Sequence, residues 1–249
     1  MKQIYLLGGH DLEMTEIKRM LESQNKHYED HFLNWSNAHL SSYSETISAF
    51  PDAEFFGIEL KEDIAIPMHY CRIDHHNDYS NRDASILQIA KLLNIIPNHY
   101  IQLVAANDTG YIPAMISLGA TDDEIKKIRR LDRMAQGVTE EDEKLAEQSI
   151  ANNLKRNGNL IIVKSLTSKF SPICDRLYPY QSLLIYTDEE WVYYGKEKTT
   201  LIDSMAHEIT EGSVYYGGGA NGYIGAARGC YSSFEIQKTI SSIVQRYGI

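Results

Sequence analysis

The chain has 249 residues, of which 43% are hydrophobic, so it is long enough to form one large domain or two smaller ones. It carries 34 acidic and 24 basic residues, and the resulting formal net charge of −10 argues against tight, charge-driven binding to long nucleic acid. A short anionic substrate, held by a metal and a few local cations, stays compatible with this balance. The three cysteines are widely spaced and include no Cys-x-x-Cys pair, so neither a disulfide framework nor a zinc ribbon is indicated.

The N-terminal apolar run is short and ends at Gly8-Gly9. It lacks the pattern of a signal-peptide cleavage site, and no stretch approaches the roughly 18 continuous apolar residues of a membrane span. We therefore expect a cytoplasmic protein that does not enter a membrane.

The first half of the sequence alternates between strand-like and helix-like patterns. Apolar runs predict strands, and apolar residues at helical spacing predict helices. Two capping boxes, Thr121 to Glu124 and Thr139 to Asp142, open further helices, the first of which ends around Gly137. This alternation indicates a mostly parallel sheet with helical crossovers. The earlier predicted strands are 4–7, 55–60 and 64–73, and the earlier helices are 14–21, 85–93 and 100–106.

The second half has a different pattern. Residues 155–159, Lys-Arg-Asn-Gly-Asn, are the best candidate for a linker. Beyond them, strand-like segments at 160–163, 182–186 and 191–194 precede a glycine cluster and a final helix. We therefore predict an α/β protein with a mostly parallel-sheet N-terminal domain at 1–157 and a smaller α+β domain at 158–249.

Polar groups gather where one predicted strand ends, in the segment Arg72-Ile73-Asp74-His75-His76-Asn77. Burying a carboxylate and two imidazoles without partners is costly, so they suit the carboxyl end of a strand better than a core. A surface or helix-capping role is the alternative.

Other carboxylates follow other predicted elements. The carboxyl ends of parallel strands meet in one crevice, and carboxylates crowded there repel each other unless a cation neutralises them. Carboxylates mixed with imidazole, without thiolate, favour Mn²⁺ or Mg²⁺. Asp11 and Glu13 could instead belong to a helix N-terminus, and Glu59 could simply meet water. The carboxylates in question are Asp11, Glu13, Glu59 and Asp108.

Two motifs carry a resemblance to a known family. Ile73-Asp74-His75-His76-Asn77 resembles the signature of the DHH phosphoesterases, and Asn107-Asp108-Thr109-Gly110 is similar to their later Asp-Thr-Gly element. The resemblance implies a catalytic parallel-sheet domain, a smaller second domain, and two divalent ions, Mn²⁺ being expected before Mg²⁺. It implies that His76 faces the substrate phosphate and that Asp74 orients or helps coordinate. The metal ligands that it implies are Asp11, Glu13, Glu59, His75 and Asp108.

The glycine-rich segment near the C-terminus is also similar to a substrate-binding motif of that family. It comprises Tyr216 to Gly219 and continues to Gly225-Ala226-Ala227-Arg228-Gly229. Backbone amides of Gly217, Gly218 and Gly219 can cradle a phosphate, and Arg228 can add a bidentate contact. The glycines could equally form a turn that requires positive φ.

The sequence also departs from the family pattern. Glutamate stands at Glu13 and Glu59, where the family has aspartate; the expected upstream histidine is Leu7; and Ala220-Asn221 follow the glycines. Our leading hypothesis is a metal-dependent phosphohydrolase for a small phosphoester, such as a nucleotide or short oligonucleotide. These departures favour the alternative, a non-catalytic DHH-like binding protein with a degenerate metal site, while the net charge disfavours an exonuclease for long nucleic acid. A homo-oligomer is possible.

A basic band runs along the predicted helix that begins at Thr121. Its members are Lys126, Arg129, Arg130 and Arg133. Such a band is more typical of a solvated helix face than of a substrate clamp.

Overall fold

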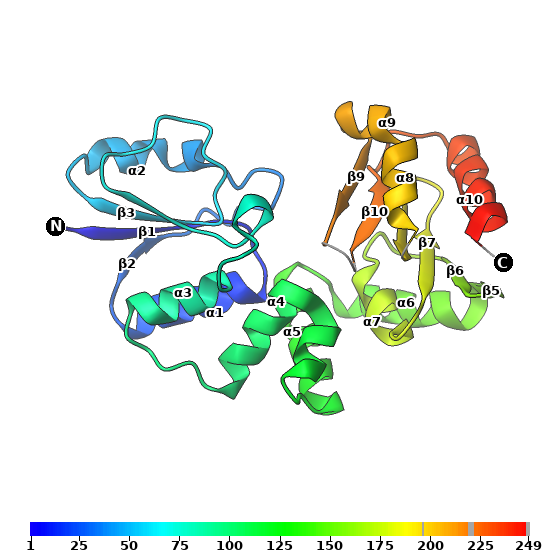
Figure 1. Ribbon diagram of the computed structural model, residues 1–249, viewed down its shortest axis with the longest axis horizontal. Coiled ribbons are helices and arrows are strands. Elements are labelled where there is room, and N and C mark those ends of the chain that lie inside the picture. Colours follow the sequence, from blue (N-terminus) through cyan, green and yellow to red (C-terminus); the bar gives the residue numbers. More distant parts are fainter. Residues whose placement is uncertain (196, 219–221, 248–249) are drawn as a thin grey trace. The chain divides into compact units, whose positions relative to one another are not determined.

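The computed structural model describes residues 1–195, 197–218 and 222–247, and it divides into two compact units, Met1–Gly137 and Val138–Ile249 (Figure 1). The mixed α/β fold class is confirmed. The division lies after Gly137, so the boundary expected after residue 157 falls inside the second unit.

The first unit contains a four-stranded sheet in which every pair of neighbours is parallel, in the order β2-β1-β3-β4. Parallel pairing requires crossovers. Helices supply them between β1 and β2 and between β2 and β3, whereas the irregular segment 59–69 connects β3 to β4. The carboxyl ends of β1, β3 and β4 consequently share one edge. The strands are β1 (Gln3–Leu7), β2 (His27–Glu29), β3 (Glu54–Ile58) and β4 (Tyr70–Ile73).

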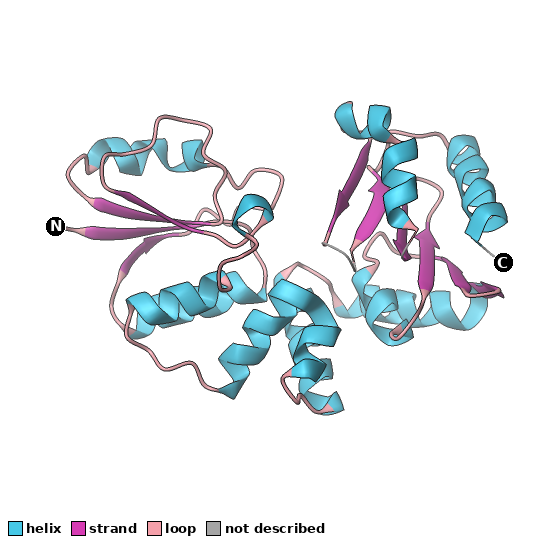
Figure 2. Ribbon diagram, viewed as in Figure 1, coloured by secondary structure: helices cyan, strands magenta, loops and turns pink. Residues whose placement is uncertain are grey.

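Helices lie on both faces of this sheet (Figures 1 and 2). On the face below α2, Ile4 and Phe55 join one hydrophobic cluster. Their neighbours Tyr5 and Phe56 point to the opposite face and stack at 4.7 Å between ring centroids. Both faces are buried, which explains the near-continuous apolar runs of β1 and β3. The helices are α1 (Leu12–Ser23), α2 (Ser44–Ala49), α3 (Ser85–Leu92), α4 (His99–Ser117) and α5 (Asp122–Ala135), with short 3-10 turns at η1 (Leu40–Tyr43) and η2 (Asn77–Tyr79).

The strand predicted at 64–73 is wrong in its first half. Only Tyr70–Ile73 is strand. Pro67 has no N–H to donate to a ladder, and the neighbouring Met68 side chain is 89% exposed, so this apolar stretch has no sheet to join.

The basic band on α5 is half buried rather than fully solvated. Arg129 and Arg133 are buried, whereas Lys126 and Arg130 are exposed. Arg129 Nη1 donates to Asn107 Oδ1 of α4 at 2.9 Å and to Asp132 Oδ2 at 2.6 Å. We call Asn107, Arg129 and Asp132 the arginine cluster.

The second unit is built on a six-stranded mixed sheet in the order β5-β6-β7-β8-β10-β9, in which only β6 and β7 pair in parallel. Its strands are β5 (Leu154–Asn157), β6 (Leu160–Lys164), β7 (Ser182–Tyr186), β8 (Trp191–Gly195), β9 (Val214–Gly217) and β10 (Tyr223–Ala226). Its helices are α6 (Glu140–Asn153), α7 (Ser171–Leu177), α8 (Lys198–Ser204), α9 (Ala206–Thr210) and α10 (Ser233–Tyr247).

Each face of this second sheet has its own hydrophobic cluster. Phe170 and Ile173 join the cluster on the α6–α7 side, and Leu201 and Ile240 join the cluster on the α8–α10 side. The predicted linker at 155–159 is wrong, because these residues form β5 and the turn of an antiparallel hairpin with β6. The Asn-Gly pair at 157–158 is a hairpin-turn signal as much as a linker signal, and Gly158 adopts φ +55°. No helix among the described residues of either unit is long and apolar enough to cross a membrane.

Candidate metal centre

The predicted site residues of the first unit come from four segments at one edge of its sheet. Glu13 lies in the first turn of α1, which follows β1. Glu59 follows β3 directly, His75 follows β4, and Asp108 lies within α4. Because β1, β3 and β4 are parallel neighbours, their carboxyl ends bring the first three residues together.

The three carboxylates converge on the His75 ring. His75 Nε2 is 2.6 Å from Asp108 Oδ2, 3.3 Å from Glu59 Oε1 and 3.6 Å from Glu13 Oε2. Their side chains are almost fully buried, the most accessible being that of Asp108 at 14%. We call Glu13, Glu59, His75 and Asp108 the carboxylate–histidine cluster.

The converging atoms approach one another without making hydrogen bonds. Among the described residues, Glu13 Oε2, both Glu59 carboxylate oxygens, His75 Nε2 and Asp108 Oδ2 are buried and have no hydrogen-bond partner. Buried polar atoms are nearly always hydrogen-bonded, so five such atoms at one place require an explanation. Ligand atoms directed at a common cation have this arrangement.

His76 extends the group toward solvent. Its Nδ1 lies 3.8 Å from Glu59 Oε1 and 3.4 Å from Asp74 Oδ1, and its side chain is 40% exposed. Asp74 Oδ1 also accepts a 2.9 Å hydrogen bond from the His76 backbone N–H. Candidate ligand atoms of Glu59, His75, His76 and Asp108 all lie within 4.8 Å of one another, so His76 stands close enough to share the site.

The crowding of charge shifts the pKa of every group in the cluster. Burial, and then Asp108 and Glu59, raise the pKa of Glu13 well above its usual value. Burial also raises the pKa of Asp108, although His75 opposes this. Burial would lower the pKa of His75, but the carboxylates of Asp108, Glu13 and Glu59 raise it to about 12. Burial likewise opposes ionisation of Glu59, yet His75 and His76 hold its pKa below the usual range.

The backbone is unusual where it positions Glu59 and Asp108. Glu59 has φ +52°, a region that non-glycine residues rarely adopt, and its N–H donates to Ile73 O at 2.9 Å. A Cβ on Gly8 would lie 2.6 Å from Glu59 O, so glycine lets the ends of β1 and β3 approach closely. In α4, the helical geometry breaks just after Asp108, at Gly110 and Tyr111 (φ +59°).

Asp11 and Glu13 differ in how they are used. Asp11 is the N-cap of α1, accepting from Met14 N at 2.8 Å, so the helix-start alternative holds for this residue. Its pKa is raised well above the usual value by burial and by Glu59 and Asp108, which indicates that its carboxyl lies near theirs. Glu13 accepts from Ile86 N of α3 at 3.0 Å through Oε1, which leaves Oε2 for the His75 side.

The family pattern has a histidine upstream of Asp11, and neither Leu7 nor His10 supplies a metal ligand in its place. Leu7 is buried in the hydrophobic core. His10 stacks on Phe32 at 5.6 Å between ring centroids, and its Nδ1 lies 3.3 Å from Ala135 O. His10 therefore does not replace the histidine that the family pattern has at position 7.

The donor set of the cluster fits a hard divalent cation. It offers carboxylate oxygens and imidazole nitrogen without a thiolate, which suits Mn²⁺ or Mg²⁺. Such an ion would give the oxygens that lack hydrogen bonds a partner, and it would offset the repulsion among the carboxylates.

A cavity of about 540 Å³ opens beside the cluster. Glu59, Asp74 and His76 form part of its wall, so the solvent-facing side of the site borders a space large enough for a small molecule. Sequence reasoning missed other members of this wall, among them Trp35, Lys61 and Tyr79, because they lie on irregular segments or in a short 3-10 turn without periodicity or a motif. Arg72 of β4 also lines the wall; it belongs to the segment singled out around the Asp-His-His triplet, but no role was predicted for it.

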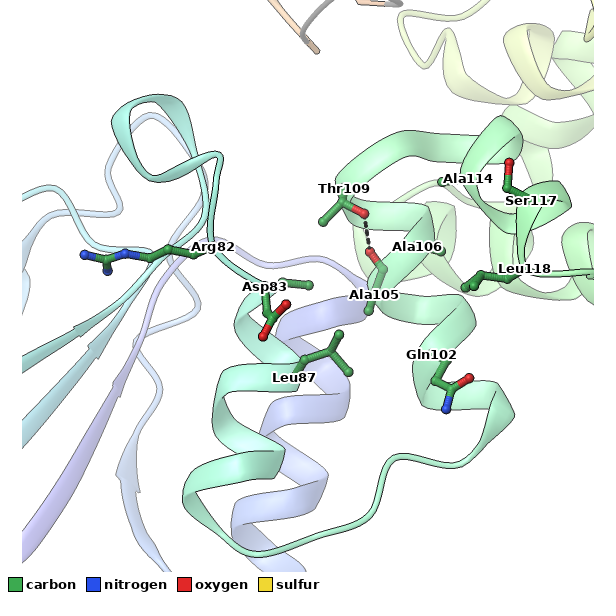
Figure 3. A pocket seen from close by; sticks show the side chains of 11 residues that line it. Arg82, Asp83, Leu87, Gln102, Ala105, Ala106, Thr109, Ala114, Ser117 and Leu118 are labelled. Atoms are coloured by element: carbon green, nitrogen blue, oxygen red, sulfur yellow. Dashed lines mark hydrogen bonds between the residues drawn. The ribbon is translucent and has the colours of Figure 1, made fainter.

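A second cavity, of about 580 Å³, lies between α3 and the two parts of α4 and contains no member of the cluster (Figure 3). Thr109 Oγ1 donates to Ala105 O at 2.9 Å and is thus turned back onto its own helix. Arg82 extends away from the cavity, and its guanidinium lies 4.2 Å from the centre of the Tyr79 ring. Leu87, Ala106 and Leu118 contribute apolar wall, so this cavity lacks the chemistry of the first.

The predicted substrate-binding residues belong to the second unit. Gly217 ends β9, and Gly218 has φ +72°, as the turn alternative requires. Gly219 lies outside the described residues. Arg228 is largely exposed, and its Nε donates to Glu189 Oε2 at 2.6 Å.

No family model matches the sequence, and no curated protein sequence matches it significantly. Solved structures do match. A DHH domain from a member of the s1p family of ribosomal proteins superposes with a TM-score of 0.54 at 11% identity, covering 98% of this chain and 86% of that one. The chain has the fold of a DHH-domain protein. The predicted DHH-like architecture is thereby confirmed.

Two further structures resemble the chain more weakly. A pGpG-specific phosphodiesterase, PggH from Vibrio cholerae, gives a TM-score of 0.49 at 12% identity and covers 98% of both chains. The exonuclease RecJ bound to manganese gives 0.42 at 9% identity, covering 99% of this chain and 90% of its own.

Proposed function

We propose that this DHH-fold protein is a divalent-metal-dependent phosphoesterase that hydrolyses a small phosphodiester. The observation that carries the proposal is the convergence of five buried atoms without hydrogen bonds in the carboxylate–histidine cluster. Three carboxylates crowd around the single His75 Nε2 at 2.6 to 3.6 Å, which is more negative charge than one imidazolium can neutralise. The adjoining cavity, with His76 and Asp74 in its wall, gives such a site room for a substrate.

Glu13, Glu59, His75 and Asp108 would hold the ion, and Mn²⁺ is the metal we propose. When bound, the ion would act as a Lewis acid on the phosphoester and lower the pKa of a water molecule beside it. Glu13 keeps its ligand oxygen oriented because its other oxygen accepts from Ile86 N.

His76 and Asp74 would act on the substrate side of the cluster. Burial would lower the pKa of His76, but Asp74 and then Glu59 raise it, which favours the protonated ring. An imidazolium at the cavity wall can donate to a phosphoryl oxygen and stabilise the charge that develops there. Asp74 would fix the orientation of that ring through its 3.4 Å contact with Nδ1.

We also propose that Asp11 helps to hold a second ion together with Glu59 and Asp108. The raised pKa of Asp11, caused by burial and by those two carboxylates, supports this, because a further cation would offset the same repulsion. Metal analysis of the purified protein and of Asp11→Asn tests it. We expect the variant to bind one Mn²⁺ fewer per chain; equal stoichiometry in both proteins would contradict the second site.

In the second unit, we propose that Gly217, Gly218 and Arg228 contact the substrate, as their motif implies. Backbone amides of a positive-φ turn favour anions, and Gly218 has that conformation. Arg228 would have to exchange its exposed pairing with Glu189, which costs little in water. Cytoplasmic location and homo-oligomer formation stay predictions.

The test of the main proposal is hydrolysis of bis(p-nitrophenyl) phosphate with and without Mn²⁺ by the full chain. We expect Mn²⁺-dependent turnover that EDTA abolishes, and a loss of at least about 10²- to 10³-fold in kcat/KM in His75→Ala. His27→Ala is the matched control, since His27 is exposed at the far edge strand of the sheet. Tight Mn²⁺ binding without any turnover would instead support the non-catalytic binding protein.

A further inference from the structure

Trp35 is an unusual residue in the wall of the cavity beside the cluster. It lies in the irregular segment between β2 and η1, and 48% of its surface is exposed. The cavity is otherwise lined largely by polar and charged groups, among them Glu59, Asp74 and Lys61. A large apolar ring held at such a place without burial marks a contact surface for something flat and apolar.

Gly9 supports one face of the Trp35 indole. A Cβ at Gly9 would lie 2.6 Å from Cδ2, 2.8 Å from Cε3 and 2.9 Å from Cε2 of the indole. Cδ2 is the ring-junction atom bonded to both of the others, so a point nearly equidistant from the three lies over the ring face, not at its edge. The backbone at Gly9 therefore covers one face, and the exposed surface of Trp35 belongs to the other face and the outer edge.

The supported ring lies next to the cluster. Its centroid is 5.5 Å from that of His76, at an interplanar angle of 61°, and the His76 ring in turn lies 4.2 Å from the His75 ring. Trp35 and the proposed metal ligand His75 therefore both contact the His76 ring, and Trp35 shares the cavity wall with Glu59. The other large aromatic group of the wall, Tyr79, already has the guanidinium groups of Arg72 and Arg82 over its ring, at 4.5 and 4.2 Å.

We propose that Trp35 is a specificity-determining residue that stacks on a nucleobase of the substrate, so that the small phosphodiester is a nucleotide derivative. The proposal rests on the phosphoesterase function above and narrows its substrate class. A base stacked on the free indole face would leave its attached phosphodiester on the His76 side, next to the cluster. Stacking accepts any base, because every base has a π-face.

Kinetics with a dinucleotide and its abasic counterpart test the proposal. Both carry the same phosphodiester and sugar, so only the base differs. We expect Trp35→Ala to lose about 5- to 100-fold in kcat/KM on the dinucleotide and far less on the abasic form, with Trp35→Phe restoring most of the preference. Gly9→Ala should weaken the preference too, because the added methyl group displaces the indole while Trp35 itself is kept.

Phe32→Ala is the matched control on the same segment. Phe32 is 69% exposed, stacks on His10 and is not part of the cavity wall, so its removal should leave the preference for the base unchanged. If Trp35→Ala lowers kcat/KM equally on both substrates, Trp35 only positions His76. The stacking proposal then fails while the phosphoesterase function stands.

A binding measurement tests the proposed stacking on Trp35 without requiring turnover. The chain has two tryptophans, and the other, Trp191, is 1% exposed in the core of the second unit. With Mg²⁺ present, adenosine 5′-monophosphate should quench the tryptophan emission of the wild-type protein but not that of Trp35→Phe, and ribose 5-phosphate should quench neither. Quenching by both compounds, or by neither, would overturn the stacking role. Quenching in a protein that hydrolyses no phosphoester would keep stacking and overturn the catalytic function instead.

Discussion

Two neighbouring polar clusters in the first unit are both buried, but they differ in whether their polar atoms are hydrogen-bonded. Asn107 and Asp108 are consecutive in α4, yet Asn107 accepts from Arg129 in the arginine cluster, whereas Asp108 faces His75 in the carboxylate–histidine cluster. In the arginine cluster, opposite charges make short hydrogen bonds. In the carboxylate–histidine cluster, buried oxygens approach one nitrogen and make none.

The difference separates a structural polar group from a binding site. A buried charge is tolerated when it is paired and hydrogen-bonded, and it is costly otherwise. The arginine cluster ties α5 to α4, and Asp132 Oδ1 accepts from Leu12 N at the start of α1. It thereby holds in place the helices that carry Glu13 and Asp108. The arginine cluster thus stabilises the scaffold. That scaffold holds the like charges of the carboxylate–histidine cluster close together.

The largest expected effect comes from opening the arginine cluster. Arg129→Leu removes the cation and leaves the buried Asp132 carboxylate unpaired, so we expect a loss of about 3–5 kcal/mol in the free energy of unfolding. Urea denaturation followed by circular dichroism measures it. Lys126→Leu, at an exposed position of the same helix, should change stability by no more than about 0.5 kcal/mol. Equal losses in the two variants would show that the arginine cluster is not structural.

A smaller effect of opposite sign is expected when a carboxyl group leaves the carboxylate–histidine cluster. In Glu13→Gln, the amide oxygen can still accept from Ile86 N, and the neutral amide needs no proton, whereas the Glu13 carboxyl must either take up a proton at pH 8 or repel Asp108 and Glu59. In EDTA at pH 8 we therefore expect the variant to be more stable than wild type by about 1–3 kcal/mol. Added Mn²⁺ should stabilise the variant less than wild type, because it has lost a charged ligand.

The matched change in the other cluster is Asp132→Asn. It also replaces a carboxylate by an amide, but it removes the negative charge that pairs with the buried Arg129, so it should destabilise the protein. Thermal unfolding of the two variants in EDTA compares them directly. If both variants lose stability, the carboxylates of both clusters stabilise the metal-free protein. The metal site proposed for the carboxylate–histidine cluster would then lose its physical basis.

The sequence predicted several elements of the first unit and several residues of its candidate site, but not the difference between the two clusters. Apolar runs and capping boxes predicted β1, β3 and α5 because local patterns specify such elements. The Asp-His-His triplet was singled out because it follows a predicted strand, and its resemblance to the DHH motifs connected it with Asp108. The sequence did not distinguish Asn107 from Asp108 as members of different clusters, since that depends on which helix packs against each side of α4.

Other features depended on contacts between segments far apart in the chain. Arg129 belongs to a basic band, and only the packing of α5 on α4 shows that its guanidinium is buried. Trp35 lies on a segment with no periodicity, and its proximity to His76 arises from tertiary structure. The exposed stretch before Tyr70 was misread as strand because apolar composition alone does not provide a neighbouring strand.

The most gradual expected effect is a dependence of stability on pH that metal should reverse. Burial and neighbouring carboxylates raise the pKa values of Asp11 and Glu13 well above their usual range, and the pKa of His75 is raised to about 12. Each group then keeps in the folded state a proton that the unfolded chain releases. The stabilisation from His75 is complete below its unfolded pKa of about 6.5 and is lost as pH rises toward 12. Glu59, whose pKa is lowered, contributes in the opposite sense, but only near and below about pH 4.5.

In EDTA, the free energy of unfolding should therefore fall from about pH 6 to about pH 8.5, by at most about 1.4 kcal/mol per pH unit for each proton involved. Mn²⁺ competes with these protons for the same atoms, so the stabilisation that it provides should grow over the same range. Tm measured in matched buffers with EDTA or Mn²⁺ tests both trends. A Tm in EDTA that rises with pH would mean that the cluster does not retain protons in the folded state. The distinction between the two clusters would then rest on hydrogen-bond geometry alone.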